Sequence, residues 1–427
     1  MDIIKLLKEN EEYIISCRRW LHEHPEESAM EFETLEFIKG ELGKMNIEHV
    51  HVADGGILAF LGSEEKGKGR TVLLRADIDA LALNEYENNL AGPKPCVSKR
   101  PGYCHACGHD GHTAMLLGCA KVLHEHEDEI PGRIILMFEQ GEEETDSVRY
   151  IYKYIEDNGI HIDTVYGTHL YAGLESGKIS VNAGPVMSGS MPFSVTIRGK
   201  GGHGSRPDMA FSPVDCFAAL YNALNTLRLR RITPFNSLTF SVGSVHSGTV
   251  GNVIPDELTF NGTVRVFDIE DGKRFADEMK KCCENTCAAY DCELAELRVS
   301  GPGVPVCNDK FLAGLAQEGI RELGGDYLGS VEPWMASEVF GLTQLKWPGV
   351  FGFVGINNPE KGTGALHHNG AFDVDESVLA VGAASYIAYA MKYLNYEGEL
   401  PDNGFKGSFH DLFVMSRRSK EEISLFE

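Results

Sequence analysis

Nine consecutive residues form the densest group of side chains in this sequence that could bind a metal. They read Cys-His-Ala-Cys-Gly-His-Asp-Gly-His over residues 104–112 and supply thiols, imidazoles and a carboxylate. Thiolate and imidazole together suit a borderline cation such as zinc, and a nearby carboxylate can orient a ligand histidine. The pattern favours a metal site, with Cys107 and His109 in a loop just before a helix and Asp110 as the supporting carboxylate.

The same stretch allows other interpretations. Cys104 and Cys107 have the C-x-x-C spacing of a thiol redox pair, whose activity would depend on Cys104. A structural zinc site needs a second Cys or His pair at similar spacing, and the sequence has none. Attachment of a c-type haem is excluded because Gly108, not histidine, follows Cys107.

Acidic residues follow the predicted strand 134–138, at Glu139 and Glu142–Glu144. In an open α/β sheet, ligands gather at the carboxyl ends of the strands. One carboxylate there can bind a metal while its neighbour takes a proton from a metal-bound water. Such a run taken alone is typical of a solvated loop, and the cluster before it favours the functional interpretation.

Further polar side chains follow predicted strands or precede the last long helix. They are Asp77 and Asp79 after strand 71–74, His169 at the end of strand 165–169, and the pair His367 and His368. Each of these is commonplace alone. Four strand ends that deliver Asp, Cys/His, Glu and His to one edge of a sheet indicate a shared site.

Hydrophobic periodicity predicts the elements that must position these residues. Helices are expected over 2–48 (broken at Pro25), 111–126, 311–323 and 376–394, and strands over 57–61, 71–74, 134–138, 165–169 and 350–354. This alternation predicts an α/β domain with a largely parallel central sheet, built from residues 1–186 and 301–427.

A different pattern interrupts that domain over residues 187–300. It predicts strand 192–198, helix 212–231, strands 237–245 and 258–267, helix 271–290 and strand 292–300. This β-α-β-β-α-β order is the ferredoxin-like α+β arrangement, so we expect a small inserted domain. Cys282, Cys283 and Cys287 on its second helix are expected to be buried thiols.

Composition excludes several classes of protein. The 427 residues carry a formal net charge of −24, which argues against binding to nucleic acid. The charged, amphipathic N-terminal segment does not resemble a signal peptide, and runs of about 18 apolar residues, as needed to span a membrane, are absent. The 11 cysteines are therefore expected to be mostly reduced, in the cytoplasm. The glycines of 199–204 match G-x-G-x-x-G, but the next predicted helix starts only near Ser212. The acidic residue that a dinucleotide site needs about 20 residues on is also missing, since no Asp or Glu lies between Asp215 and Asp256.

Taken together, these residues resemble the M20-type metallopeptidases, in the amidohydrolase branch that cleaves hippurate, auxin conjugates and other N-acyl amino acids. The matching segments, spread over nearly the whole chain, are 18–26, 74–81, 105–115, 199–207, 251–256, 262–265 and 372–376. The stretch HACGHDGHTAM over 105–115 is the most specific of them.

The resemblance implies a site for two divalent ions, which could be Zn, Mn, Co or Ni. Its ligands would be Cys107, bridging both ions, with His109, Glu143, His169 and one of His367 or His368. We favour His368 because its spacing to Phe372 matches the family pattern. Glu142 would be the general base that activates a metal-bound water, and Asp77, Asp79 and Asp110 would support the ligands. Glu144 is a third candidate glutamate, so the assignment of base and ligand depends on the register of this segment with the family pattern.

The resemblance also assigns roles to the inserted domain. His203 would polarise the scissile carbonyl or stabilise the oxyanion, and Asn252 and Arg265 would bind the substrate. Family members usually form homodimers through this domain, so that a partner's histidine can reach the site.

We therefore expect hydrolysis of an amide bond in an N-acyl amino acid or a related small conjugate. The alternatives are a dipeptidase or carboxypeptidase, a thiol redox protein, and a ligand-binding protein with little turnover. The sequence departs from the family pattern at Glu139-Gln140-Gly141, Ala82, Asp208 and Val339. These departures bear on the substrate more than on the reaction.

Overall fold

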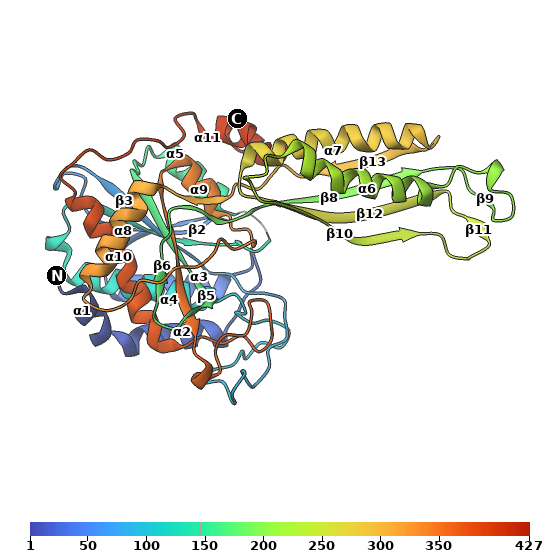
Figure 1. The fold of residues 1–427 in the computed structure, drawn as a ribbon. Coiled ribbons are helices and arrows are strands. Elements are labelled where there is room, and N and C mark those ends of the chain that lie inside the picture. Colours follow the sequence, from blue (N-terminus) through green and yellow to red (C-terminus); the bar gives the residue numbers. More distant parts are fainter. Residues whose placement is uncertain (145–146) are drawn as a thin grey trace. The chain divides into compact units, whose positions relative to one another are not determined.

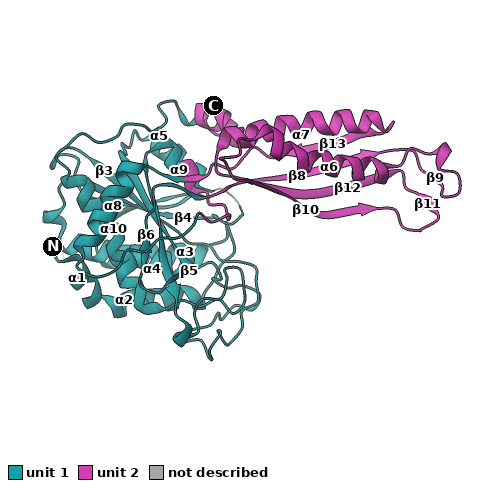
Figure 2. Cartoon of the chain, in the orientation of Figure 1, with its two compact units in different colours: residues 1–186, 307–332, 343–409 teal, residues 187–306, 333–342, 410–427 magenta. Residues whose placement is uncertain are grey.

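The computed structural model of the chain describes residues 1–144 and 147–427. These residues form two compact units, which Figure 2 colours separately. The first unit contains residues 1–186, 307–332 and 343–409, and the second contains residues 187–306, 333–342 and 410–427.

The second unit is larger than the predicted insertion of 187–300. Segments 301–306, 333–342 and 410–427, predicted within the larger domain, belong to the second unit instead. Ser188 Oγ donates a hydrogen bond to Met335 O at 2.7 Å, and Arg417 forms an ion pair with Asp277 at 2.9 Å. These contacts join segments far apart in the chain, so local sequence patterns carry no signal for them.

A seven-stranded sheet forms the centre of the first unit, in the spatial order β1-β2-β4-β3-β5-β15-β6 (Figure 1). Its strands are β1 (Glu48–Val52), β2 (Gly56–Gly62), β3 (Thr71–Asp77), β4 (Arg133–Glu139), β5 (Thr164–Glu175), β6 (Ile179–Ser180) and β15 (Gly349–Asn357). The neighbours β4, β3, β5 and β15 are parallel, and the other pairs are antiparallel. The predicted, mostly parallel central sheet is confirmed.

One predicted strand end is wrong. Strand β5 does not stop at His169 but continues to Glu175, because β15 pairs along it until Asn357 lies opposite Glu175. His169 therefore lies within a paired strand, with its backbone held on the β15 side by the partner Phe353.

Helices pack around this sheet. In the first unit they are α1 (Ile3–Glu9), α2 (Glu11–Glu23), α3 (Phe32–Lys44), α4 (His109–Glu125), α5 (Val148–Asp157), α8 (Lys310–Glu322) and α10 (Leu379–Asn395). The stretch predicted as helical over 2–48 thus forms three helices, the second ending just before Pro25. A further helix, α9, spans Phe340–Lys346.

Helix α10 is the apolar core helix of the first unit. Residues 376–395 are long and apolar enough to cross a membrane by length and composition alone. However, 83% of the apolar window is buried inside the protein. Tyr386 and Tyr389 of α10 pack against Tyr166 of β5. Helix α10 is therefore apolar because it packs inside the first unit.

The second unit has the predicted ferredoxin-like order. Its main elements are β8 (Gly189–Arg198), α6 (Pro213–Arg231), β10 (Leu238–Ser247), β12 (Glu257–Val266), α7 (Ile269–Ala289) and β13 (Glu293–Val299). The antiparallel sheet has the order β10-β12-β8-β13. Cys283 and Cys287 are buried in its core, as predicted, whereas Cys282 is only partly buried.

Shorter elements complete the chain. They are β7 (Gly184–Met187), β9 (Gly202–His203), β11 (Val253–Ile254), β14 (Val306–Asn308), α11 (Phe409–Met415) and α12 (Lys420–Ser424). Strands β9 and β11 pair with each other beyond the ends of β8 and β12 (Figure 1).

Candidate metal centre

The cluster predicted to bind metal lies at the start of helix α4. Gly108 precedes the helix with a φ of 93°, in the left-handed region that glycine adopts without strain. This turn makes His109 the first residue of α4, two positions earlier than predicted, and leaves Cys107 in the preceding loop. Both side chains are buried.

The carboxyl ends of two neighbouring strands lie beside this loop. Asp77 at the end of β3 is in register with Glu139 at the end of β4. Arg75 is fully buried and pairs with both carboxylates, with distances of 2.7 Å to Asp77 and 2.6 Å to Glu139. The expected gathering of polar groups at one edge of the sheet is therefore present.

Two groups of side chains could each hold a cation, and they share one residue. Cys107, His109 and His169 form the first group, and Cys107, Glu143 and His368 form the second. Within each group the ligand atoms lie within 4.8 Å of one another. Cys107 Sγ lies 3.4 Å from His169 Nε2, and His368 Nε2 lies 3.3 Å from Glu143 Oε1.

Two other combinations of side chains meet the same distance limit. One is His109 with Glu142 and Glu143, which places the predicted base beside two predicted ligands. The other is Asp77 with His109 and His112. In that combination Asp77 and His112 already bind each other at 2.6 Å, so we interpret them as supports rather than ligands.

Asp79 supports candidate ligands of both groups. Its Oδ1 accepts a hydrogen bond from His109 Nδ1 at 2.9 Å, and its Oδ2 accepts one from the backbone N–H of Glu143 at 2.9 Å. Ser28 donates a further hydrogen bond to Asp79. Because Nδ1 of His109 carries the proton toward Asp79, its Nε2 lone pair is left for a metal.

His112 has a supporting role that the sequence analysis did not assign. Its Nδ1 donates to Asp77 Oδ1 at 2.6 Å, and its Nε2 accepts from the backbone N–H of Leu170 at 2.8 Å. His169 Nδ1 in turn donates to Leu170 O at 2.7 Å, so its Nε2 is the atom facing Cys107. The spacing of His109 and His112, three residues apart on one helix face, was the available signal.

Glu31 holds the loop that carries the glutamates. Its carboxylate accepts hydrogen bonds from Gln140 Nε2 at 2.9 Å and from the backbone N–H of Gly141 at 2.8 Å. Burial, together with the neighbouring Asp79, raises the pKa of Glu31 to about 7. The segment Glu139-Gln140-Gly141, which departs from the family pattern, is thus anchored directly before Glu142.

The electrostatics of the site keep its carboxylates charged. Burial disfavours the charged form of Asp77 and Asp79, but the neighbouring histidines, and Arg75 at Asp77, keep the pKa of both below the ordinary value. Burial, with the neighbouring His112, lowers the pKa of His169 well below its ordinary value and favours the neutral imidazole that binds metals. Burial, with the neighbouring Glu143, raises the pKa of the Cys107 thiol, and a bound cation would favour its thiolate instead.

The donor set fits divalent cations. Among the residues that the structure describes, His109 Nε2 and Glu143 Oε1 are buried side-chain atoms without a hydrogen bond. They lie 3.8 Å apart at the junction of the two groups. Buried polar atoms are normally satisfied, and a cation coordinated by both would satisfy them here. One thiolate, imidazoles and a carboxylate suit borderline divalent metals.

His367 and His368 are neighbours in the loop before helix α10, but their surroundings differ. His368 Nε2 approaches Glu143, whereas His367 Nε2 accepts from the backbone N–H of Ala172 at 3.3 Å. The ring of His367 lies among those of His169 and Phe372. Burial, with nearby histidines, lowers the pKa of His367 to about 3. This geometry favours His368 over His367 as a ligand.

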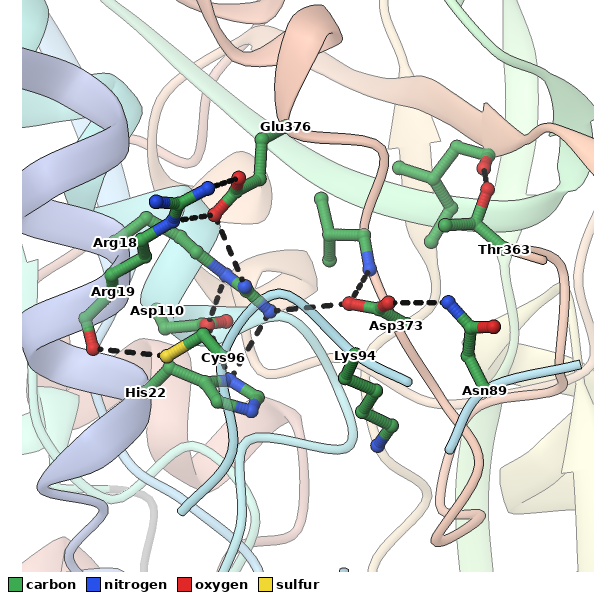
Figure 3. Close-up of polar contacts among 12 residues, drawn as sticks. Arg18, Arg19, His22, Asn89, Lys94, Cys96, Asp110, Thr363, Asp373 and Glu376 are labelled. Carbon is green, nitrogen blue, oxygen red and sulfur yellow. Dashed lines mark hydrogen bonds and ion pairs between the residues drawn. The ribbon is translucent and has the colours of Figure 1, made fainter. Parts of the chain in front are cut away.

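Asp110 and Cys104 are placed differently from the ligands. Asp110 binds Arg18 at 2.7 Å and His22 at 2.8 Å (Figure 3), whereas the candidate ligand His109 is oriented by Asp79. Burial raises the pKa of Cys104 to about 12, the reverse of the lowered pKa of reactive redox thiols. The redox interpretation of Cys104 and Cys107 is therefore disfavoured.

The three predicted residues of the inserted domain all lie in the second unit, but not together. His203 on β9 pairs with Val253, and Gly204 N donates to Asn252 O at 2.9 Å, so His203 and Asn252 are neighbours. Arg265 lies near the other end of β12, where its Nη1 donates to Ser337 Oγ at 2.9 Å. At about 3.3 Å per residue, the stretch of β12 from Glu257 to Arg265 alone spans roughly 26 Å.

Known proteins resemble this chain over most of its length. The family model "Peptidase family M20/M25/M40" matches residues 73–392. IAA-amino acid hydrolase ILR1-like 4 of Arabidopsis thaliana is 33% identical over 409 residues, covering 92% of this chain and 88% of that protein. N-acetyl-L-cysteine deacetylase of Bacillus subtilis is 35% identical over 381 residues, covering 89% of this chain and 87% of that protein. Other relatives are named carboxypeptidases.

A solved structure from Bacillus subtilis, described as a dinuclear metal binding peptidase from the M20 family, has a TM-score of 0.75 and 30% identity. The match covers 91% of this chain and 99% of that one. The family match over most of the chain, the relatives and this shared fold lead to one conclusion: the chain is a metal-binding hydrolase that belongs to peptidase family M20/M25/M40.

Proposed function

We propose that this protein hydrolyses the amide bond of N-acyl amino acids or related small conjugates, with two divalent ions held by Cys107, His109, Glu143, His169 and His368. The observation that carries the proposal is the pair of ligand groups that share Cys107. Relatives named as an IAA-amino acid hydrolase and an N-acetyl-L-cysteine deacetylase support this substrate class. Zinc, manganese, cobalt and nickel all suit the donor set.

The bound ions would lower the pKa of a water molecule and draw electron density from the scissile carbonyl. The other tasks fall to side chains of this protein. Glu142, beside His109 and Glu143, accepts the proton of the attacking water and passes it to the leaving amine. Asp79 and His112 keep the ligand imidazoles in fixed orientations during these steps.

The distance along β12 favours a homodimer that forms through the second unit. His203 and Asn252 lie at one end of this unit and Arg265 near the other, too far apart for one small substrate to touch all three in one chain. We propose that Arg265 binds substrate of its own chain, and that His203 and Asn252 act on the substrate of a partner chain. There His203 would stabilise the oxyanion.

Carboxypeptidase activity is the second candidate function, because relatives that cover 92% of this chain carry that name. A free α-carboxylate next to the scissile amide is common to peptides and N-acyl amino acids, so one site could accept both. We also propose a cytoplasmic location, since the 11 cysteines of the described residues are free thiols.

The test is a panel of N-acyl amino acids and dipeptides, offered to the chain reloaded with each metal and to a chelated control. Glu142→Gln should lower kcat by about 10²–10⁴-fold while two ions per chain are still bound. Glu144→Gln is the matched control, since Glu144 is the neighbouring carboxylate without an assigned role, and it should retain activity. Near-full activity of Glu142→Gln would contradict the assigned base.

A further inference from the structure

Arg18 of helix α2 is a fully buried cation with acidic partners from two distant parts of the chain. Its Nε lies 2.7 Å from Asp110 Oδ2, its Nη1 lies 3.4 Å from Glu376 Oε1, and its Nη2 lies 3.8 Å from Asp373 Oδ1. Figure 3 shows the guanidinium between these carboxylates. The planar guanidinium carries five N–H donors on three nitrogens, so one side chain can reach partners that lie apart, whereas the donors of lysine all lie on a single nitrogen.

The two segments that Arg18 joins are the ones that carry candidate ligands. Asp110 directly follows His109 at the start of α4. Asp373 and Glu376 follow His368 in the last loop. Arg18 therefore ties the loop of the shared thiolate to the loop that supplies His368, without touching a ligand itself.

The loop of His368 needs such an anchor. His368 has a φ of 59°, a left-handed conformation that costs a residue with a Cβ about 1 kcal/mol or more. Such a conformation persists only where the surroundings hold it. On the near side, His368 N donates to Ala106 O at 2.9 Å, and Lys94 Nζ donates to Gly370 O at 2.9 Å. On the far side, Asn89 and Arg18 hold Asp373.

We propose that Arg18 is a positioning residue that holds His368 in place for the second of the two ions, the one assigned to Cys107, Glu143 and His368. This inference rests on the two-metal site proposed above and adds to it a residue that acts on one ion and not on the other.

The selectivity follows from how the first group is held. His109 is fixed by helix α4 and by Asp79, and His169 by a paired strand and by its hydrogen bond to Leu170 O. Asp110 also keeps His22 as a second partner at 2.8 Å. Loosening Arg18 therefore leaves the first group anchored, whereas the segment after His368 loses the contacts of Asp373 and Glu376 with Arg18.

The experiment is a Co²⁺ titration of the metal-depleted full-length chain, followed by the absorption of the cobalt–thiolate bond and by the number of ions bound. Arg18→Lys keeps a positive charge beside Asp110 but cannot span to Asp373 and Glu376. Asp373→Asn cuts the far end of the link with an isosteric side chain. In both variants the first ion should bind within about twofold of wild type, and the second about 10–100-fold more weakly.

Arg19→Gln is the matched control. Arg19 binds the same Glu376 at 2.6 Å, but its side chain is partly exposed and, among the described residues, forms no hydrogen bond or ion pair with Asp110. It should bind both ions as wild type does.

The outcomes separate the two proposals. Wild type that binds fewer than two ions contradicts the proposed two-metal site, and this inference with it. Two ions in wild type with unchanged second-ion affinity in the variants, or with both ions weakened equally, overturns the role of Arg18 alone. If Arg18→Lys does not fold, as judged by circular dichroism, Asp373→Asn decides by the same criteria.

Discussion

The two candidate ion-binding groups share Cys107 but are built from different kinds of structure. In the first group, His109 is 1% exposed and His169 is 3% exposed, on a helix start and a central strand. In the second, the side chain of His368 is 53% exposed and comes from a loop with a left-handed residue. Ligands on rigid elements are held more closely to the required geometry than ligands on loops.

This difference predicts that the ion in the first group binds more tightly. It also predicts that the affinity for the ion in the second group depends more strongly on the residues that hold the loop of His368. It also explains the two kinds of support. Asp79, Asp77 and His112 support His109 and His169 through short hydrogen bonds, and Asp79 also holds the backbone of Glu143. His368 of the second group depends instead on a longer chain of contacts through Ala106, Lys94 and Arg18.

Removal of Cys107, the side chain shared by both groups, should have the largest effect, because both ions would lose a ligand. Cys107→Ala deletes the one atom common to both groups, so we expect loss of both ions. We expect kcat/KM to fall on the order of 10³-fold or more, because the cations supply several kcal/mol of transition-state stabilisation. Metal content by mass spectrometry of the native protein and steady-state kinetics measure the two effects.

Cys104→Ala is the control for that variant, because Cys104 is a second buried thiol of the same motif. It should keep both ions and its activity. Loss of activity in Cys104→Ala with full metal content would instead revive the redox interpretation.

Replacing the exposed His368 should affect the binding of one ion and not of the other. His368→Asn is expected to weaken only the second ion, by at least the 10–100-fold typical of a supporting residue, while the first remains. His367→Asn provides the matched neighbour and should leave both affinities nearly unchanged. The measurement is calorimetric titration with Zn²⁺ of each metal-depleted variant. The reverse pattern would make His367 the ligand.

A smaller effect is a pH dependence of stability caused by Glu31, the residue that holds the loop of Glu142 and Glu143. The pKa of Glu31 in the folded protein, about 7, lies above its ordinary value of 4.5, so the folded state binds the proton more tightly. Below about pH 4.5, Glu31 is protonated in both the folded and the unfolded state and does not lower the stability of the protein. As the pH rises from 4.5 to 7, the free energy of unfolding falls by up to roughly 3 kcal/mol. Glu31→Gln removes this slope.

The measurement is denaturant unfolding of the metal-depleted chain at pH 5 and pH 7.5. Wild type should lose stability relative to Glu31→Gln over that interval. A constant difference between the two proteins at both pH values would show that Glu31 does not retain its proton in the folded state.

Much of the first unit could be predicted from local patterns. Strands 71–74 and 134–138 were each found within three residues of their observed ends, because buried parallel strands are short apolar runs bounded by polar residues. The end of β5 was missed because pairing with β15, far along the chain, decides it. The start of α4 was placed late because Gly108 and His109 carry little intrinsic preference for a helix.

The supporting residues were harder to find than the ligands. Arg18 lies in segment 18–26, which resembles the family's opening, and Glu31 follows shortly after it, yet no motif states what they touch. His112 and Asp77 bind each other although 35 residues separate them in the chain. The short segments 333–342 and 410–427 were assigned to the wrong unit for the same reason, since their partners are distant in sequence.

The amino-acid sequence was sufficient for the kinds of ligand, the parallel sheet and the ferredoxin-like insertion, because residue chemistry and hydrophobic periodicity are local properties. The resemblance already implied a shared Cys107 and favoured His368, but only the folded chain showed that these side chains lie close to one another and that a buried arginine joins the two segments that carry them. Those features depend on which side chains meet after distant segments pack together, and a linear pattern does not contain distances.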